Sequence, residues 1–194
     1  MEAFKKYNKY IMIGLAVIAL LGIIFPLVHI HIHLLGTTTM SLRVLDMFGN
    51  LGSEVPQEAL DFAISDELAM SIALPIIAYF LAFFLTITTL VLAFTDKLKI
   101  LKIVFVSIAM TLMIYAGASI TSLPNTLSNY LGDFIADLFG DLAGLFASLL
   151  DLSNILEINL GAGYWITLIM LLVMLILLIV TKIIEYTQKK VSAD

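Results

Sequence analysis

Four long, uninterrupted apolar stretches constrain this chain more than any other feature of its sequence. They lie at about residues 11–28, 68–95, 100–123 and 164–181, and no acid, base or histidine lies in the central part of any of them. A helix needs about 20 apolar residues to cross the hydrocarbon core of a bilayer. The sequence therefore predicts four transmembrane helices within a single integral membrane domain over residues 1–194.

The composition excludes the main classes of soluble protein. Of the 194 residues, 61% are hydrophobic and 13% are charged, whereas soluble domains average about 45–50% and about 25%. So few polar groups cannot cover a water-exposed surface, which excludes a soluble enzyme, a disordered tail and a nucleic-acid-binding domain. The chain has no cysteine, so disulfides and thiolate metal sites are excluded as well.

The basic residues predict how the chain sits in the membrane. Nine of the ten flank the apolar stretches on one side: Lys5, Lys6, Lys9, Lys97, Lys99, Lys102, Lys182, Lys189 and Lys190. Because short lysine-rich loops stay in the cytoplasm, we expect a multi-pass protein of the cell membrane with both termini cytoplasmic. The segments at about 29–67 and 124–163 are then extracytosolic. They hold eleven of the fifteen acids and one base, Arg43, and so carry a formal charge of −10.

Three runs of alternating apolar and polar residues in the outer segments predict strands. They cover residues 28–34, 39–45 (after a turn at 35–37) and 155–160. Alternation with a period of two is typical of half-buried strands, and in the first run it puts His29, His31 and His33 on one face. Because an isolated hairpin is only marginally stable, we expect all three strands to form one small sheet.

Two helices are expected beside this sheet. One begins near Ser53 and runs into the second span. The other covers about residues 133–150 and carries a stripe of acids together with small residues: Asp133, Asp137, Asp141, Gly140 and Gly144. Such an amphipathic helix either covers the sheet, lies on the membrane surface, or forms an interaction surface for a partner. Tyr164 and Trp165, at the start of the fourth span, predict an aromatic anchor at the membrane interface.

Together these elements predict an all-α transmembrane four-helix bundle with a small extracytosolic β-sheet and an outer amphipathic helix. A strand hairpin directly after the first span, a helix leading into the second and a strand just before the fourth resemble the layout of claudin-like tetraspan proteins. The resemblance implies a sheet built from both outer loops on a left-handed bundle, with adhesion, barrier or accessory-subunit roles. It carries over no site residue, because residues 29–67 lack the tryptophan and cysteine of that family's first-loop signature.

The three histidines are the main candidate for chemistry. Imidazoles bind zinc, copper or nickel well, and two histidines at positions i and i+2 of a strand can share one ion. A zinc or copper site here would use one or two of His29, His31 and His33 with a carboxylate from outside the strand, such as Asp46 or Glu157. The alternative is that the histidines are amphipathic interface residues, hydrogen-bonded to headgroups, acids or backbone carbonyls.

Sequence motifs of enzymes are missing, so we expect a protein that is not an enzyme. The hydroxyl residues inside the spans are expected to bind backbone carbonyls four residues earlier or a neighbouring helix: Thr86, Thr88, Thr89, Ser107 and Thr111. The leading hypothesis is a four-span protein whose acidic extracytosolic domain contacts a second copy of itself or another membrane or surface protein. The lipid bilayer is a further expected partner, and no nucleic acid is expected to bind. The alternatives are an oligomeric cation channel with an acidic outer vestibule and a metal-handling membrane protein.

Overall fold

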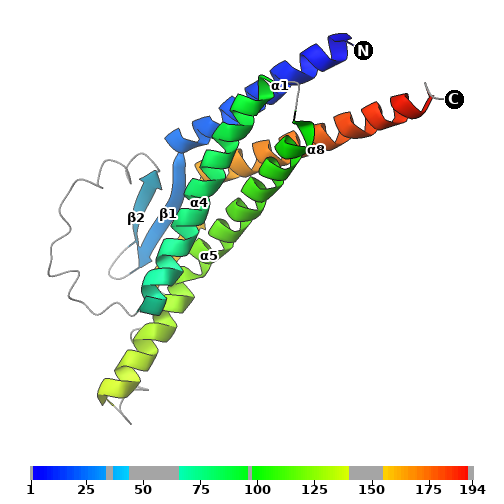
Figure 1. Cartoon of the computed structure of the whole chain (residues 1–194). Coiled ribbons are helices and arrows are strands. Elements are labelled where there is room, and N and C mark those ends of the chain that lie inside the picture. Colours follow the sequence, from blue (N-terminus) through cyan, green and yellow to red (C-terminus); the bar gives the residue numbers. More distant parts are fainter. Residues whose placement is uncertain (1, 34–36, 44–65, 96–97, 140–154, 192–194) are drawn as a thin grey trace. The chain divides into compact units, whose positions relative to one another are not determined.

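A computed structural model of the chain describes residues 2–33, 37–43, 66–95, 98–139 and 155–191. Side chains are described throughout these ranges except at residues 2–6, 66–69, 134–139, 189 and 191. Most of the chain is helical (Figure 1): α1 (Glu2–Leu21), a 3-10 turn η1 (Gly22–Ile24), α4 (Asp66–Ala93), α5 (Lys99–Phe139) and α8 (Ala162–Val191). The three strands are β1 (Pro26–His33), β2 (Thr37–Arg43) and β3 (Leu156–Leu160).

The described helices include four that are long and apolar enough to cross a membrane, which confirms the prediction of four long apolar helices. The qualifying segments are Tyr7–Ile24, Met70–Ala93, Lys99–Asp133 and Ala162–Gln188. The first ends earlier than predicted, because the chain leaves the helical conformation after Ile24 and begins β1 at Pro26. A proline lacks the backbone N–H that a continuing helix requires. The predicted helix start near Ser53 lies outside the described residues.

Helix α5 corrects the expectation of two separate helices in this part of the chain. It runs without a break through Pro124 to Phe139, so Asp133 belongs to the same helix as the third apolar stretch. The hydroxyls of Thr121 and Ser122 donate hydrogen bonds to carbonyl oxygens in the turn before the proline, as hydroxyl residues do in proline-containing membrane helices. At about 1.5 Å per residue, its 41 residues span about twice the thickness of a hydrocarbon core.

Buried positions recur at alternating intervals of three and four residues along the helices. The positions that follow this pattern are Pro75, Tyr79, Ala82, Thr86, Thr89 and Ala93 in α4, Lys102, Val106, Ala109, Met113, Ala116 and Ile120 in α5, and Tyr164, Thr167, Leu171, Met174, Leu178 and Thr181 in α8; Ala78, Gly117, Pro124 and Gly163 are buried as well. This is the spacing of contact positions in coiled coils. Many of these residues are small, which allows backbones to approach closely.

Four of the five hydroxyl residues named in the prediction bond as expected, and for Ser107 it stays a prediction. Thr86, Thr88, Thr89 and Thr111 each donate to the carbonyl oxygen four residues earlier, at 2.8–3.0 Å. Thr167 differs, because its Oγ1 reaches the backbone oxygen of Ala19 in α1 at 3.0 Å. Thr167 therefore connects α8 to α1, while Thr86, Thr88, Thr89 and Thr111 bond within their own helices.

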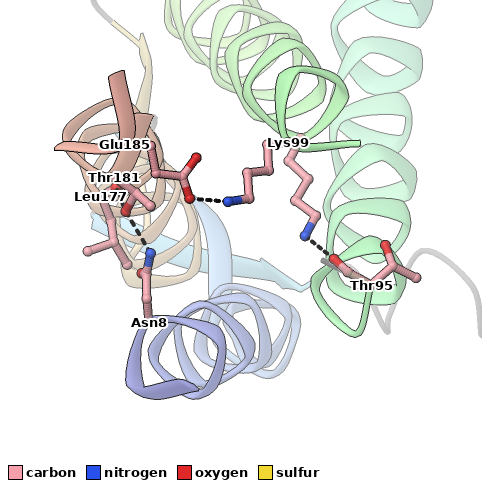
Figure 2. Close-up of polar contacts among 7 residues, drawn as sticks. Asn8, Thr95, Lys99, Leu177, Thr181 and Glu185 are labelled. Carbon is pink, nitrogen blue, oxygen red and sulfur yellow. Dashed lines mark hydrogen bonds and ion pairs between the residues drawn. The ribbon is translucent and has the colours of Figure 1, made fainter. Parts of the chain in front are cut away.

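The chain divides into two compact units, of which the first is helical. It comprises Met1–Gly22, Ala78–Ile114 and Trp165–Asp194. Polar side chains connect its helices at one end (Figure 2): Asn8 Nδ2 donates to Thr181 Oγ1 at 2.6 Å, and Lys99 forms an ion pair with Glu185. These two contacts connect α1 and α5 to α8.

Two further lysines of this unit bind the turn that follows α4. Lys9 Nζ donates to the backbone oxygen of Phe94 at 3.0 Å, and Lys102 Nζ donates to that of Thr95 at 2.5 Å. Both carbonyls lie just after Ala93, the last residue of α4, so the two lysines satisfy backbone groups of the turn that follows the helix. Lys102 is only 8% exposed, which makes this contact part of the packed interior.

The second unit, Ile23–Ile77 and Tyr115–Tyr164, contains the sheet. Its strand order is β2-β1-β3 and both pairs are antiparallel, which confirms the predicted hairpin and third strand; Figure 1 shows β1 and β2 as neighbouring arrows. Directly after β3, Gly161 N donates to Leu27 O at 2.7 Å. A Cβ on Gly161 would lie 2.2 Å from the backbone oxygen of Pro26, so only glycine permits this approach.

We expect Gly161→Ala to destabilise the protein by about 1–3 kcal/mol, the usual cost of overpacking, because the clashing atom is backbone and cannot rotate away. Thermal unfolding in detergent micelles measures the change. Gly132→Ala is the matched control, since a Cβ there meets nothing within 4 Å and alanine favours a helix over glycine. Equal stability of the two variants would contradict the proposed close approach.

Leu98 precedes α5 with a φ of 65°, a left-handed conformation that is unfavourable for leucine by about 1–2 kcal/mol. Its carbonyl accepts the first backbone bond of the helix, from Lys102 N, and its side chain is 57% exposed. We expect Leu98→Gly to raise the stability by about 1 kcal/mol, because glycine adopts this φ freely and little packing is lost. In the same assay Val104→Gly, within α5, should lower it by a similar amount.

Candidate functional site

One face of the sheet gathers nearly all of its polar side chains. His29, His31 and His33 alternate along β1, opposite hydroxyl residues of β2: Ser41, Thr39 and Thr37. On the other side of β1, Asn159 of β3 lies opposite His29 and Glu157 lies opposite His31. We call this set of eight residues the histidine face.

Each histidine ring is held by a hydroxyl on the neighbouring strand. Hydrogen bonds join Nδ1 to the partner hydroxyl at 2.9 Å for His29 and Ser41, at 3.0 Å for His31 and Thr39, and at 3.4 Å for His33 and Thr37. The same contact therefore repeats three times along the hairpin. Because Nδ1 is engaged toward β2 in every ring, Nε2 is the nitrogen that remains for contacts elsewhere.

Glu157 lies beside two of these rings. Its Oε2 is 3.7 Å from His33 Nε2, and its Oε1 accepts a hydrogen bond from Asn159 Nδ2 at 2.9 Å. The Asn159 hydrogen bond, reinforced by the positive charge that His31 and His33 carry when protonated, lowers the pKa of the Glu157 carboxyl below its ordinary value. The carboxylate is thus ionised at neutral pH and gives the histidine face a local negative charge.

The opposite face of the sheet is apolar and partly exposed. Ile30, Ile32 and Ile158 are half-buried, whereas Met40 and Leu42 of β2 are 55% and 37% exposed. All seven residues of β2 are exposed, and β2 is an edge strand. Among the described residues, no strand other than β1 pairs with β2, so the outer edge of β2 is open from Thr37 to Leu42.

The structure brings together some of the residues expected to bind a metal. Glu157 reaches His33, as a carboxylate from outside the strand was expected to do, while Asp46 lies outside the described residues. Within the described ranges, no three His, Asp or Glu side chains lie close enough together to form a ready-made metal cluster. A three-ligand zinc or copper site is therefore not preformed in this part of the chain.

The remaining candidate residues have different environments. Asp133 is exposed on α5, and Asp137 lies in the same helix; Gly140, Asp141 and Gly144 lie outside the described residues. The predicted interaction surface on this segment thus remains a prediction.

The aromatic pair at the start of α8 divides between interior and surface. Tyr164 is 3% exposed and packs so closely on Gly117 that a Cβ there would meet its hydroxyl at 2.3 Å, whereas Trp165 is 49% exposed. Of the two predicted anchors, only Trp165 presents its side chain to the surroundings.

The sequence alone did not predict which residues of β2 and β3 lie beside the histidines. The alternation over 39–45 predicts a strand, but it does not identify Thr39 and Ser41 as partners of the histidines. Their alternation with Met40 and Leu42 was the available signal, but the partners follow only from the hairpin register. Asn159 was missed for the same reason.

Comparison with known proteins identifies no relative of this chain. No protein-family model matches it, and neither a curated protein nor a solved structure is significantly similar.

Glu157 makes the stability of the sheet dependent on pH. Because its pKa is lower in the folded protein, the ionised carboxylate stabilises the fold at neutral pH, and this contribution is lost as the pH falls through the folded pKa. We expect the wild type to be more stable than Glu157→Gln at neutral pH, and the two to converge in acid. Unfolding midpoints of both proteins across this pH range measure the effect; a difference that does not change with pH would contradict it.

Proposed function

We propose that this chain is a four-span protein of the cell membrane whose helices form a left-handed bundle, with both termini cytoplasmic. Two observations support this arrangement. Large apolar side chains are exposed along the helices, among them Ile77, Phe84 and Val91 at 58–63%, as lipid-facing residues would be. The buried positions follow the coiled-coil spacing, which favours crossing angles of about +20°.

The lysines of the helical unit support the proposed orientation. Lys9, Lys99 and Lys102 come from two helices, and their contacts lie at the same end as Glu185 of α8 and the turn that follows α4. The positive-inside rule assigns such an end to the cytoplasm. The sheet, which follows the opposite end of the first apolar helix, is then extracytosolic.

The function that the geometry supports best is protein–protein contact through the extracytosolic sheet, in surface assembly, adhesion or as an accessory subunit. The open edge of β2 carries this proposal. An edge strand presents unpaired backbone N–H and C=O groups that can pair with a strand of another polypeptide. Natural edges are commonly protected by proline, a charged side chain or a bulge. β2 contains no proline, and its one charged residue, Arg43, lies at its end, next to the register shift of β1 between Pro26 and Val28.

The side chains on the two faces of β2 are compatible with the addition of a further strand at this edge. Met40 and Leu42 extend the apolar face of the sheet to its edge, and Thr39 and Ser41 extend the polar one. An added strand with its own alternation would continue both faces, in a second copy of this chain or in another surface protein. The absence of enzyme motifs and of ionisable groups in the middle of the spans agrees with a binding role rather than catalysis.

The absence of cysteine allows a direct test by site-specific photocrosslinking in intact membranes. A photoactivatable label on Leu42→Cys is expected to give a discrete protein adduct, because this side chain lies on the open edge. Adding Met40→Lys should abolish the adduct, since a charge pointing across the apolar face opposes strand addition, while Met40→Leu should retain it.

A label on Trp165→Cys is the matched control, because Trp165, at 49% exposed, is at least as accessible as Leu42, at 37%, but lies outside the sheet. Recovery of monomer alone from Leu42→Cys would refute the proposal. So would an identical adduct from both labelled positions, or an adduct that Met40→Lys does not reduce.

A further inference from the structure

We propose that His31 and His33 chelate a divalent transition-metal ion of the zinc or copper class on the open face of the sheet. This inference is independent of the proposed protein contact, since it concerns the polar face of β1 and not the edge of β2. The chelate uses two imidazole nitrogens and leaves the remaining coordination positions to water. It therefore needs no third protein ligand.

The first argument for this chelate is the spacing and direction of the two imidazole rings. Residues two apart on a strand point to the same side, about 6.7 Å from one another along the chain, so two imidazoles can converge on one ion. In both rings Nδ1 is engaged by a threonine of β2, Thr39 or Thr37. When the other nitrogen is held in this way the orientation of the ring is set, and Nε2 is directed to the metal.

The second argument is the charge around the rings, which favours the pair His31 and His33 over the pair His29 and His31. Glu157 lies opposite His31 in the strand register, and its carboxylate is 3.7 Å from His33 Nε2. His29 instead lies opposite Asn159, a neutral amide. A dication is therefore attracted to the His31–His33 end of the face.

The third argument is that the site is accessible to an ion from solvent. The side chains of His33 and Glu157 are 40% and 59% exposed, so an ion reaches them from solvent and both can adjust their rotamers. Imidazole nitrogen is a preferred ligand of copper and zinc, and the chain has no cysteine to compete for them.

The test exploits the small number of histidines. The chain has three, all on this face, so a full-length protein purified without a histidine tag reports imidazole binding from these residues alone. Copper(II) is titrated into the protein in detergent micelles and followed by electron paramagnetic resonance. We expect one ion per chain with hyperfine coupling to two imidazole nitrogens.

The variants identify the ligands. His31→Ala and His33→Ala should each lose the two-nitrogen signal, whereas His29→Ala, a histidine of the same strand with the same kind of hydroxyl partner, should keep it. Thr39→Val should weaken binding about tenfold, the lower end of the usual effect of deleting an outer partner of a ligand. Circular dichroism confirms that each variant is folded.

Several results would overturn the proposal. They are no copper bound to folded wild type, a signal from one nitrogen only, and a two-nitrogen signal that survives His33→Ala, which would assign the ion to His29 and His31. Loss of copper binding would leave the crosslinking result at Leu42 unaffected, so failure of this inference and failure of the proposed function are distinguishable.

Discussion

The pairing of backbone polar groups that water does not reach is the constraint on which the rest of this structure depends. In the bilayer that we propose for these helices, an unpaired N–H or C=O costs several kcal/mol by the general rule for hydrocarbon, which favours long helices for the four apolar stretches. The same requirement applies where a helix ends. Lys9 and Lys102 bind carbonyl oxygens of the turn after α4, and Thr167 binds Ala19 O in the last turn of α1, so side chains from other parts of the chain satisfy these backbone groups.

The sheet also pairs its backbone polar groups, here between strands and not within a helix. Backbone pairing joins three strands from two distant segments, and Gly161 continues it by donating to Leu27 O. Because polar and apolar side chains alternate along each strand, the sheet has one polar and one apolar face. On the polar face, imidazoles of β1 bond to hydroxyls of β2, and the carboxylate of Glu157 bonds to the amide of Asn159 within β3. The histidine face is therefore an organised polar surface, and this order is the basis for both the pH dependence of Glu157 and the proposed metal chelate.

Sequence pattern predicted most elements, because it reports directly on which residues are buried. Uninterrupted apolar length predicted the four long helices, and alternation predicted the three strands. It failed beyond residue 123, the expected end of the third span, because the helix continues through Pro124 to Phe139 and hydroxyls bond the carbonyls before the proline. It also failed at Tyr164, since an aromatic residue at the end of a span is equally typical of an interfacial anchor and of a residue that packs on a glycine such as Gly117.

The sequence by itself determined where the chain can be helical, where it alternates and how its charges divide, because these properties depend on residues near one another along the chain. Only the tertiary structure decided which hydroxyl holds which imidazole, which lysine binds the turn after α4, and that Glu157 lies beside His33. Those contacts join positions up to 124 residues apart, and their geometry follows from strand register and helix packing, which local pattern does not contain.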